Sequence, residues 1–122
     1  MNLTIGDNDF TILAWVYLQD KVDSYTILGK WDGTGAGNEY LLYYSTGSDR
    51  FIFTAGNDTA AAPEAVANNL GSPSAGVWYF IVAWHDAVAN TINITVNNGS
   101  SDSKNLTPSV IDGPASFRIG KR

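Results

Sequence analysis

The amino-acid sequence predicts an all-β fold, an antiparallel sandwich of two sheets with little or no helix. Roughly seven short segments show apolar residues at every second position, the period of a β-strand. Segments rich in Gly, Asn, Asp and Ser separate them. The one helix-friendly stretch, residues 59–67, is interrupted by Pro63, so we expect a loop followed by a short edge strand there. Short strands joined by such turns are typical of antiparallel sandwiches and barrels.

The first expected strand spans residues 10–18. One of its faces carries Phe10, Ile12, Ala14, Val16 and Leu18. The opposite face carries Thr11, Leu13, Trp15 and Tyr17. Because both faces are largely apolar, the pattern predicts a strand that is covered on both sides.

The next expected strands span residues 25–29, 39–45 and 50–55. Turn-forming residues 45–49 separate the last two, which predicts a short hairpin loop. The longest β-type run is 77–85. The strand at 91–97 is predicted to be half-exposed, since Ile92, Ile94 and Val96 alternate with polar residues. Residues 116–119 form the last expected strand.

Length and composition indicate one domain over residues 1–122 and exclude several classes of protein. Apolar residues make up 44% of the 122 residues, enough for a packed core. The net charge of −5 disfavours nucleic acid and anionic membrane as partners. The absence of Cys excludes disulfides and thiolate metal sites. No apolar run reaches the roughly 18 residues of a membrane span, and no signal peptide is expected in this chain.

The order of these segments resembles a known family. The segments that carry the resemblance are Phe10–Val16, Gly29–Asp32, Glu39–Leu42, Gly76–Asp86, Ile92–Gly99 and Phe117–Gly120. Together they cover nearly the whole chain and resemble laminin-G-like domains of the concanavalin A-like lectin/glucanase superfamily. The resemblance implies a jelly-roll sandwich with little or no helix. It says less about function, because this fold hosts lectins, adhesion modules, enzymes and structural parts.

The chain departs from the family pattern at both ends. Family members usually have a strand before the segment that starts at Phe10, and they continue past residues 117–120 into a Gly-x-Ile-Asp-Glu segment. A shortened jelly roll should leave unpaired backbone groups and an uncovered apolar strip. We therefore expect that another copy or a partner chain completes a sheet, unless the edges of a reduced domain are protected differently or the chain is a fragment.

Catalytic residues are not expected. The resemblance implies that a glucanase of this superfamily would carry a Glu-x-Asp-x-x-Glu strand, but the chain has only Glu39 and Glu64, outside such a pattern. His85 is the single histidine, no Gly-x-Ser-x-Gly elbow is present, and His85 is expected to be a hydrogen-bonded residue at a strand end.

A calcium site is one hypothesis for residues 32–39. Asp32, Asn38 and Glu39 offer oxygen ligands on a loop that three glycines make flexible. The alternative is a Gly-rich hairpin loop with an Asx turn at Asp32. Asn57, Asp58 and Asp86 are weaker candidates.

A carbohydrate site needs an exposed aromatic ring and polar side chains beside it. Trp31 is the leading candidate because it lies at a strand end against a Gly-Asp-Asn loop; Tyr43, Asn97 and Asn98 are the other candidates. Trp31 would otherwise cap the core, and the two asparagines would form a turn. Trp15, Trp78 and Trp84 lie in dense apolar strands and are expected in the core.

The sequence thus predicts a non-catalytic module that binds carbohydrate or a surface glycan through rim loops, with calcium as an optional aid. The alternative is a structural assembly protein, a subunit of a virion surface, sheath or fibre, that uses open sheet edges for contacts. The expected partners are a glycan or glycoprotein, and a homo-oligomer or neighbouring chain. The expected location is extracellular, at a cell surface or at a virion surface.

Overall fold

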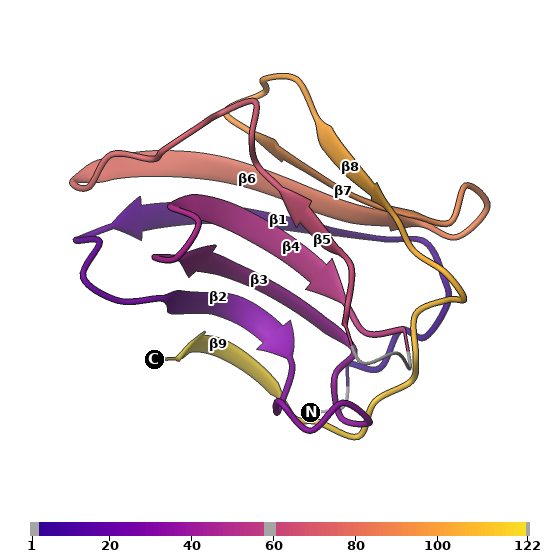
Figure 1. Cartoon of the computed structure of the whole chain (residues 1–122). Helices are drawn as coiled ribbons and strands as arrows, with labels where there is room; N and C mark the ends of the chain where they lie inside the picture. The colour runs from indigo at the N-terminus through magenta and orange to yellow at the C-terminus, as the bar shows by residue number, and fades with distance from the viewer. Residues whose placement is uncertain (1–2, 58–60, 122) are drawn as a thin grey trace.

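A computed structural model describes residues 3–57 and 61–121, and this part of the chain contains nine β-strands and no helix (Figure 1). Their bounds are β1 Phe10–Leu18, β2 Tyr25–Lys30, β3 Tyr40–Ser45, β4 Arg50–Ala55, β5 Glu64–Val66, β6 Val77–Asp86, β7 Thr91–Val96, β8 Asp102–Asn105 and β9 Phe117–Lys121. The predicted strands are confirmed with shifts of one or two residues at their ends. β5 is the short edge strand expected after Pro63.

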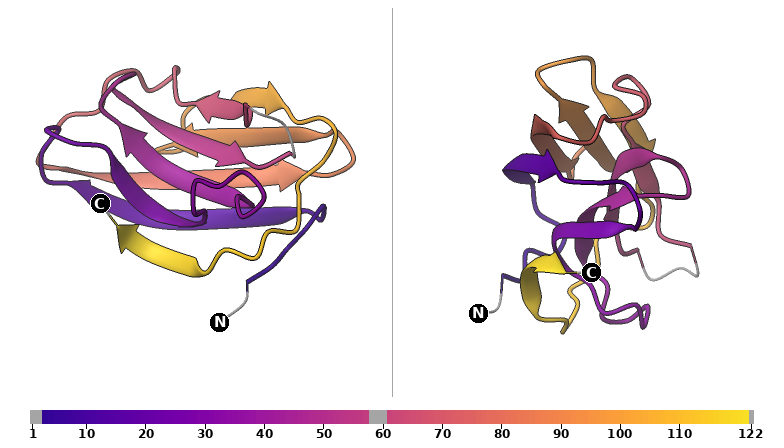
Figure 2. Two further views of the ribbon diagram at one scale, coloured as in Figure 1. Left: turned by 60° about the horizontal axis from the view of Figure 1, so that its bottom comes forward. Right: turned by 90° about the vertical axis from the view of Figure 1, so that its left-hand side faces the viewer.

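The strands form two antiparallel sheets that face each other (Figures 1 and 2). Sheet A has the order β1-β6-β7-β8, and sheet B has the order β5-β4-β3-β2-β9. The predicted two-sheet sandwich is therefore confirmed. β8 was not predicted, because its sequence Asp-Ser-Lys-Asn has no apolar alternation; it is held in place by pairing with β7.

The core lies between the inner faces of the two sheets. Leu42 and Phe53 of sheet B and Ile81 and Ile94 of sheet A are fully buried there. The rings of Phe51 in β4 and Tyr79 in β6 meet edge to face across the core, with centroids 5.2 Å apart. The predicted inward residues of β7, Ile92, Ile94 and Val96, are all buried. The prediction that the other face of β7 is exposed is wrong, because Asn93 is also buried and Thr91 and Thr95 are partly buried.

The prediction that β1 is covered on both sides is wrong. Leu13, Trp15 and Tyr17, which alternate with the inward residues, are exposed on the outer face of sheet A. The structure places no further layer of described residues over that face (Figure 2). Apolar character on both faces of a strand therefore did not mean burial on both faces, since such residues also mark interaction surfaces.

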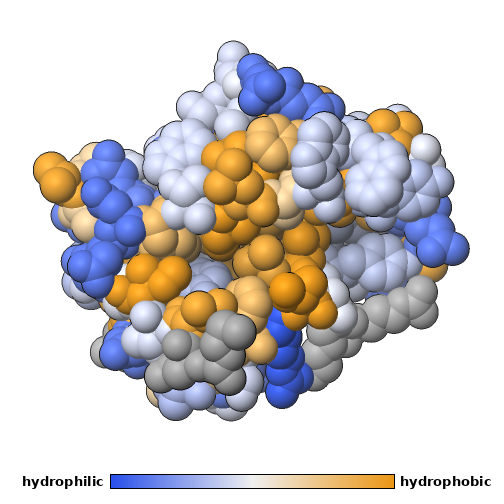
Figure 3. Space-filling model, turned by 180° about the vertical axis from the view of Figure 1, so that it is seen from behind, coloured by the Kyte–Doolittle hydropathy of each residue, from blue (hydrophilic) through white to orange (hydrophobic). Residues whose placement is uncertain are grey.

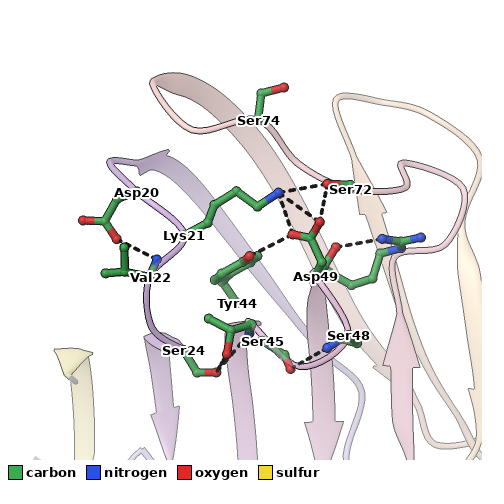
Figure 4. A network of polar contacts seen from close by, with 12 residues as sticks. Asp20, Lys21, Val22, Ser24, Tyr44, Ser45, Ser48, Asp49, Ser72 and Ser74 are labelled. Atoms are coloured by element: carbon green, nitrogen blue, oxygen red, sulfur yellow. Dashed lines mark hydrogen bonds and ion pairs between the residues drawn. The ribbon is translucent and has the colours of Figure 1, made fainter.

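A polar cluster around Asp49 joins three loops at one end of the sandwich (Figure 4). The carboxylate of Asp49, in the β3–β4 turn, accepts hydrogen bonds from Tyr44 Oη at 2.8 Å and from the Ser72 hydroxyl. It also pairs with Lys21 Nζ of the β1–β2 loop at 2.7 Å. Hydrogen bonds from Lys21, Ser72 and Tyr44 hold the pKa of Asp49 well below its usual range. Burial and the bond to Asp49 raise the pKa of Tyr44 to about 12.

This cluster predicts a loss of stability in acid. The lowered pKa of Asp49 means that the unfolded chain binds a proton more readily than the folded chain. The contribution of Asp49 is therefore fully present above about pH 5 and is lost as the pH falls below about 4. Thermal unfolding should show a higher melting temperature for the wild type than for Asp49→Asn at about pH 6. This difference in melting temperature should narrow strongly at about pH 2.5.

Asn tolerates the positive φ of 56° at position 49, so the variant isolates the charge. Asp112→Asn, the same change at an exposed site, is the matched control. A difference in melting temperature between the wild type and Asp49→Asn that stays constant with pH would contradict the role of this carboxylate.

Candidate functional site

The most prominent feature of the surface is an aromatic face on the outer side of sheet A, formed by Trp15 and Tyr17 of β1 and Trp78 and Phe80 of β6. The register pairs Trp15 with Phe80 and Tyr17 with Trp78, so each pair shares the same side of the sheet. Their ring centroids are 5.1 Å and 5.3 Å apart. Neighbouring strands thus build one continuous aromatic surface.

Three of these rings are exposed to solvent to an unusual degree. The exposed fractions of Trp15, Tyr17 and Trp78 are 68%, 49% and 59%. At about 200 Å² per aromatic side chain, these three rings present roughly 350 Å². The largest apolar patch of an ordinary monomer covers about 300–600 Å² and is often functional, and the aromatic face falls within this range. Figure 3 shows further hydrophobic side chains gathered in the middle of the same side of the molecule.

Polar side chains lie at two margins of this aromatic face. Thr11 precedes the aromatic residues of β1 on the same side and is exposed. At the other margin, Asn97 Oδ1 accepts a hydrogen bond from Phe80 N at 2.9 Å, which places Asn97 beside the row formed by Trp15 and Phe80. Asn97 and Asn98 both have positive φ and form the turn after β7, closed by Gly99 N donating to Val96 O at 3.0 Å.

The structure does not bring the four predicted carbohydrate residues together. Asn97 and its neighbour Asn98 lie beside the outer face of sheet A. Tyr43 belongs to sheet B and donates from its hydroxyl to Glu64 Oε1 at 2.6 Å on the outer side of that sheet; burial and this bond raise its pKa. Trp31 is half-buried directly after β2, also in sheet B. The four residues therefore do not surround one common point on the surface.

The expectation that most of the other tryptophans, Trp15, Trp78 and Trp84, lie in the core is wrong. Trp15 and Trp78 are more than half exposed. Trp84 is partly buried, but it pairs with exposed Thr11 on the outer side of sheet A and does not belong to the core either. The sequence signal for the exposure of Trp15 is polar Thr11, which lies on the same side of β1 as Trp15. The sequence of β6 contains no such signal for Trp78.

Of the three predicted calcium ligands, Asp32 and Asn38 stay together in the loop, where Asn38 Oδ1 accepts a hydrogen bond from Asp32 N at 3.2 Å, whereas Glu39 is directed away from them. Asp32 Oδ1 accepts hydrogen bonds from the backbone and hydroxyl of Thr34 at 2.9 Å and 2.6 Å, the Asx turn that was the alternative. The Thr34 hydroxyl is the main cause of the lowered pKa of Asp32. Asn38 Oδ1 accepts from Gly33 N at 2.9 Å. Glu39 points elsewhere, because its carboxylate is completely buried against Lys30.

The buried ion pair of Lys30 and Glu39 serves a structural role. Lys30 Nζ lies 2.8 Å from Glu39 Oε2, and both side chains are fully buried. Glu39 Oε1 accepts from the backbone of Ile5 and Gly6 at 2.6 Å and 3.0 Å, and Lys30 Nζ donates to Gly113 O at 2.8 Å. The pair thus ties the segment before β1 and the segment before β9 to the adjoining ends of β2 and β3.

The weaker candidates have structural partners as well. His85 is buried, with Nδ1 2.9 Å from Asn8 O and Nε2 3.6 Å from Asp7 Oδ1, as expected for a strand-end residue. Asn57 Nδ2 donates to Thr107 O, and Asp86 Oδ1 accepts from Ala89 N. Asp58 lies outside the described residues. Within residues 3–57 and 61–121, no group of three or more His, Asp or Glu side chains is arranged to hold a metal ion.

Comparison with known proteins agrees with this architecture. The family model of the concanavalin A-like lectin/glucanases superfamily, Laminin_G_3, matches residues 2–122. The chain belongs to this family. No curated protein matches the chain. In the described part of this laminin-G-like domain, no helix has the length and apolar character needed to cross a membrane.

The ion pair yields a prediction about stability. Lys30→Met should lower the free energy of unfolding by about 3–5 kcal/mol, because it leaves the Glu39 carboxylate buried without its countercharge. Urea denaturation monitored by tryptophan fluorescence measures the difference. The double variant Lys30→Met/Glu39→Gln should lose less than the sum of the two single variants. A loss below about 1 kcal/mol in Lys30→Met would contradict this role for the pair.

Proposed function

We propose that this laminin-G-like domain is a non-catalytic carbohydrate-binding module, and that it binds glycans on the aromatic face of sheet A. The observation that carries the proposal is the exposure of Trp15, Tyr17 and Trp78 on one side of one sheet. Folding alone gives no reason to keep three large rings in water. A partner that covers them gains the free energy of burying their apolar surface.

A sugar ring suits this surface chemically. One side of a pyranose presents C–H groups that pack against an aromatic ring, and its hydroxyls need polar partners at the margin. Thr11 and Asn97 lie at the margins of the aromatic face. From Thr11 to Tyr17 the strand extends about 20 Å, which favours several units of an extended oligosaccharide over a single sugar. The net charge of −5 favours a neutral glycan over a sulfated one.

The carboxylates of the chain support binding rather than hydrolysis. Glycoside cleavage by the usual mechanism needs two carboxyl groups that flank the scissile bond. Glu39 is buried against Lys30, whereas Glu64 accepts a hydrogen bond from Tyr43 on the outer side of sheet B. The aromatic face itself lies on the other sheet, where Trp15 and Trp78 have no acidic neighbour in the register of β1 and β6.

Removing one ring tests the proposal. Trp15→Ala should weaken binding to any glycan found on an array by about tenfold, or 1.4 kcal/mol, because the stacking surface is lost. Isothermal titration with the purified oligosaccharide measures the change. Trp31→Ala is the matched control and should bind as the wild type does. If Trp31→Ala abolishes binding and Trp15→Ala does not, the rim loops and not the aromatic face bind the glycan.

The same titration separates this mode of binding from a calcium-assisted one. EDTA should leave the affinity unchanged, because the aromatic face involves none of Asp32, Asn38 and Glu39. Loss of binding in EDTA, restored by added Ca²⁺, would instead support a calcium-assisted site. An array on which no glycan binds, with or without Ca²⁺, would overturn the carbohydrate proposal.

A structural assembly role is the second candidate, and the edge strand β1 favours it. β1 is nine residues long and contains no charged residue or proline, the features that usually protect an edge from pairing with other chains. Subunit contacts through this edge should make the mass from sedimentation equilibrium rise with protein concentration. A clean monomer at about 100 µM would count against self-assembly.

A further inference from the structure

Of the four strands at sheet edges, β1 is the least protected. β5 has three residues, and β8 and β9 carry charged side chains, among them Lys104 and Arg118. β1 pairs with β6 on one side over its full length, from Phe10↔His85 to Leu18↔Val77. Its other side faces no strand in the described part of the chain. Alternate N–H and C=O groups of β1 therefore point away from the sheet, ready to pair with a further strand.

Sheet B extends beyond β1 at this side of the sandwich. β8 contacts β5 and β7 contacts β4, so the two sheets are aligned at the opposite side. Sheet A has four strands and sheet B has five, and in Figure 1 β2 and β9 extend below β1. The margin of sheet B is thus left without a facing strand from sheet A.

The inner face of this margin is apolar and open to solvent. Ile119 of β9 pairs with Leu28 of β2, and Leu28 pairs with Leu42 of β3, whose side chain is completely buried in the core. Paired residues share a face, so Ile119 points to the inner side, yet it is 74% exposed. This margin of sheet B therefore presents an uncovered apolar strip.

A cavity of about 250 Å³ opens between the second half of β1 and the start of β2. The residues from the strands that line it are Val16, Tyr17, Leu18, Tyr25, Ile27, Tyr44 and Phe51. The backbone edge of β1, this cavity and Ile119 together form what we call the strand slot. Hydrophobic side chains are prominent on the side of the molecule that presents β1 (Figure 3).

We propose that the strand slot accepts one extended strand from another polypeptide, with apolar side chains at alternate positions. Its backbone would pair with β1, its inner side chains would cover Ile119 and fill the cavity, and its outer side chains would continue the aromatic face. The sandwich would then have five strands in each sheet. This is β-strand addition, in which the main chain supplies affinity and alternate side chains supply specificity. The proposal gives the edge of β1 a partner other than a second copy of this chain, and it does not depend on glycan binding.

The projection of sheet B beyond β1 argues against direct pairing of β1 with β1 of a second copy. Two copies joined edge to edge would each bring their own sheet B to the junction. The projecting β2 and β9 of one copy would then occupy the space that sheet B of the other copy needs. A single strand meets no such obstacle. The like charges of two copies, −5 each, add to the disadvantage.

The probe for this proposal is a short neutral peptide that alternates valine and threonine. Fluorescence anisotropy of the labelled peptide should show saturable binding to the wild type. Hydrogen exchange should slow at alternate amides of β1 when the peptide is added, and not in β5 or β8. A peptide of the same composition with its valines in one block should bind at least tenfold more weakly, since only the alternating form places every valine on the inner side.

Matched variants locate the binding. Ile119→Lys places a charge inside the slot and should weaken peptide binding at least tenfold, whereas folding should be unaffected because the side chain is exposed. Val88→Lys makes the same change at a residue that is 91% exposed in the β6–β7 turn, and should bind as the wild type does.

The outcomes separate this proposal from the functions above. A monomeric chain that binds the peptide upholds the strand slot and rejects self-assembly. No binding at about 1 mM peptide, or equal binding by Ile119→Lys and the wild type, overturns the proposal. A dimer in which hydrogen exchange slows along β1 without peptide also overturns it, because the edge would then pair with a second copy. None of these results changes the glycan titrations.

Discussion

The structure depends on one constraint: two sheets of unequal width must bury a single core between them. Sheet A has four strands and sheet B has five. Where the sheets overlap, the inward side chains of both, such as Leu42 and Ile94, are withdrawn completely from water. Where sheet B projects, Ile119 points to the inner side but remains in solvent. The unequal width of the two sheets therefore accounts for both the buried core and the open side along β1.

Two polar clusters fix opposite ends of this sandwich. At the end where β3 begins, the buried pair of Lys30 and Glu39 binds the backbone of the segments before β1 and before β9. At the end where β3 finishes, Asp49 joins loops through Lys21 and Ser72 (Figure 4). Buried or cooperative polar contacts of this kind position loops that apolar packing alone would leave free. Both ends are closed, whereas the long side along β1 stays open.

The surfaces available for function follow from this arrangement. The aromatic face lies on the outside of sheet A, and the strand slot lies along the adjacent edge of the same sheet, so β1 contributes to both. The outward side chains of β1 form part of the aromatic face, while its unpaired backbone edge forms part of the strand slot. A ligand on one surface need not displace a ligand on the other, because side chains project perpendicular to the sheet and the backbone groups lie within it.

The sequence by itself determined the fold class and most of the strand positions. Alternation of apolar residues with period two marks strands such as β7, and turn residues mark their ends. The tertiary structure alone decided which faces are covered. Trp15 and Ile12 lie on opposite faces of one apolar strand, and a single polar residue, Thr11, is the local sign that the face of Trp15 does not meet sheet B. Likewise, Glu39 lies near Asp32 in sequence, but its carboxylate pairs with Lys30, because burial of a charge demands an opposite charge.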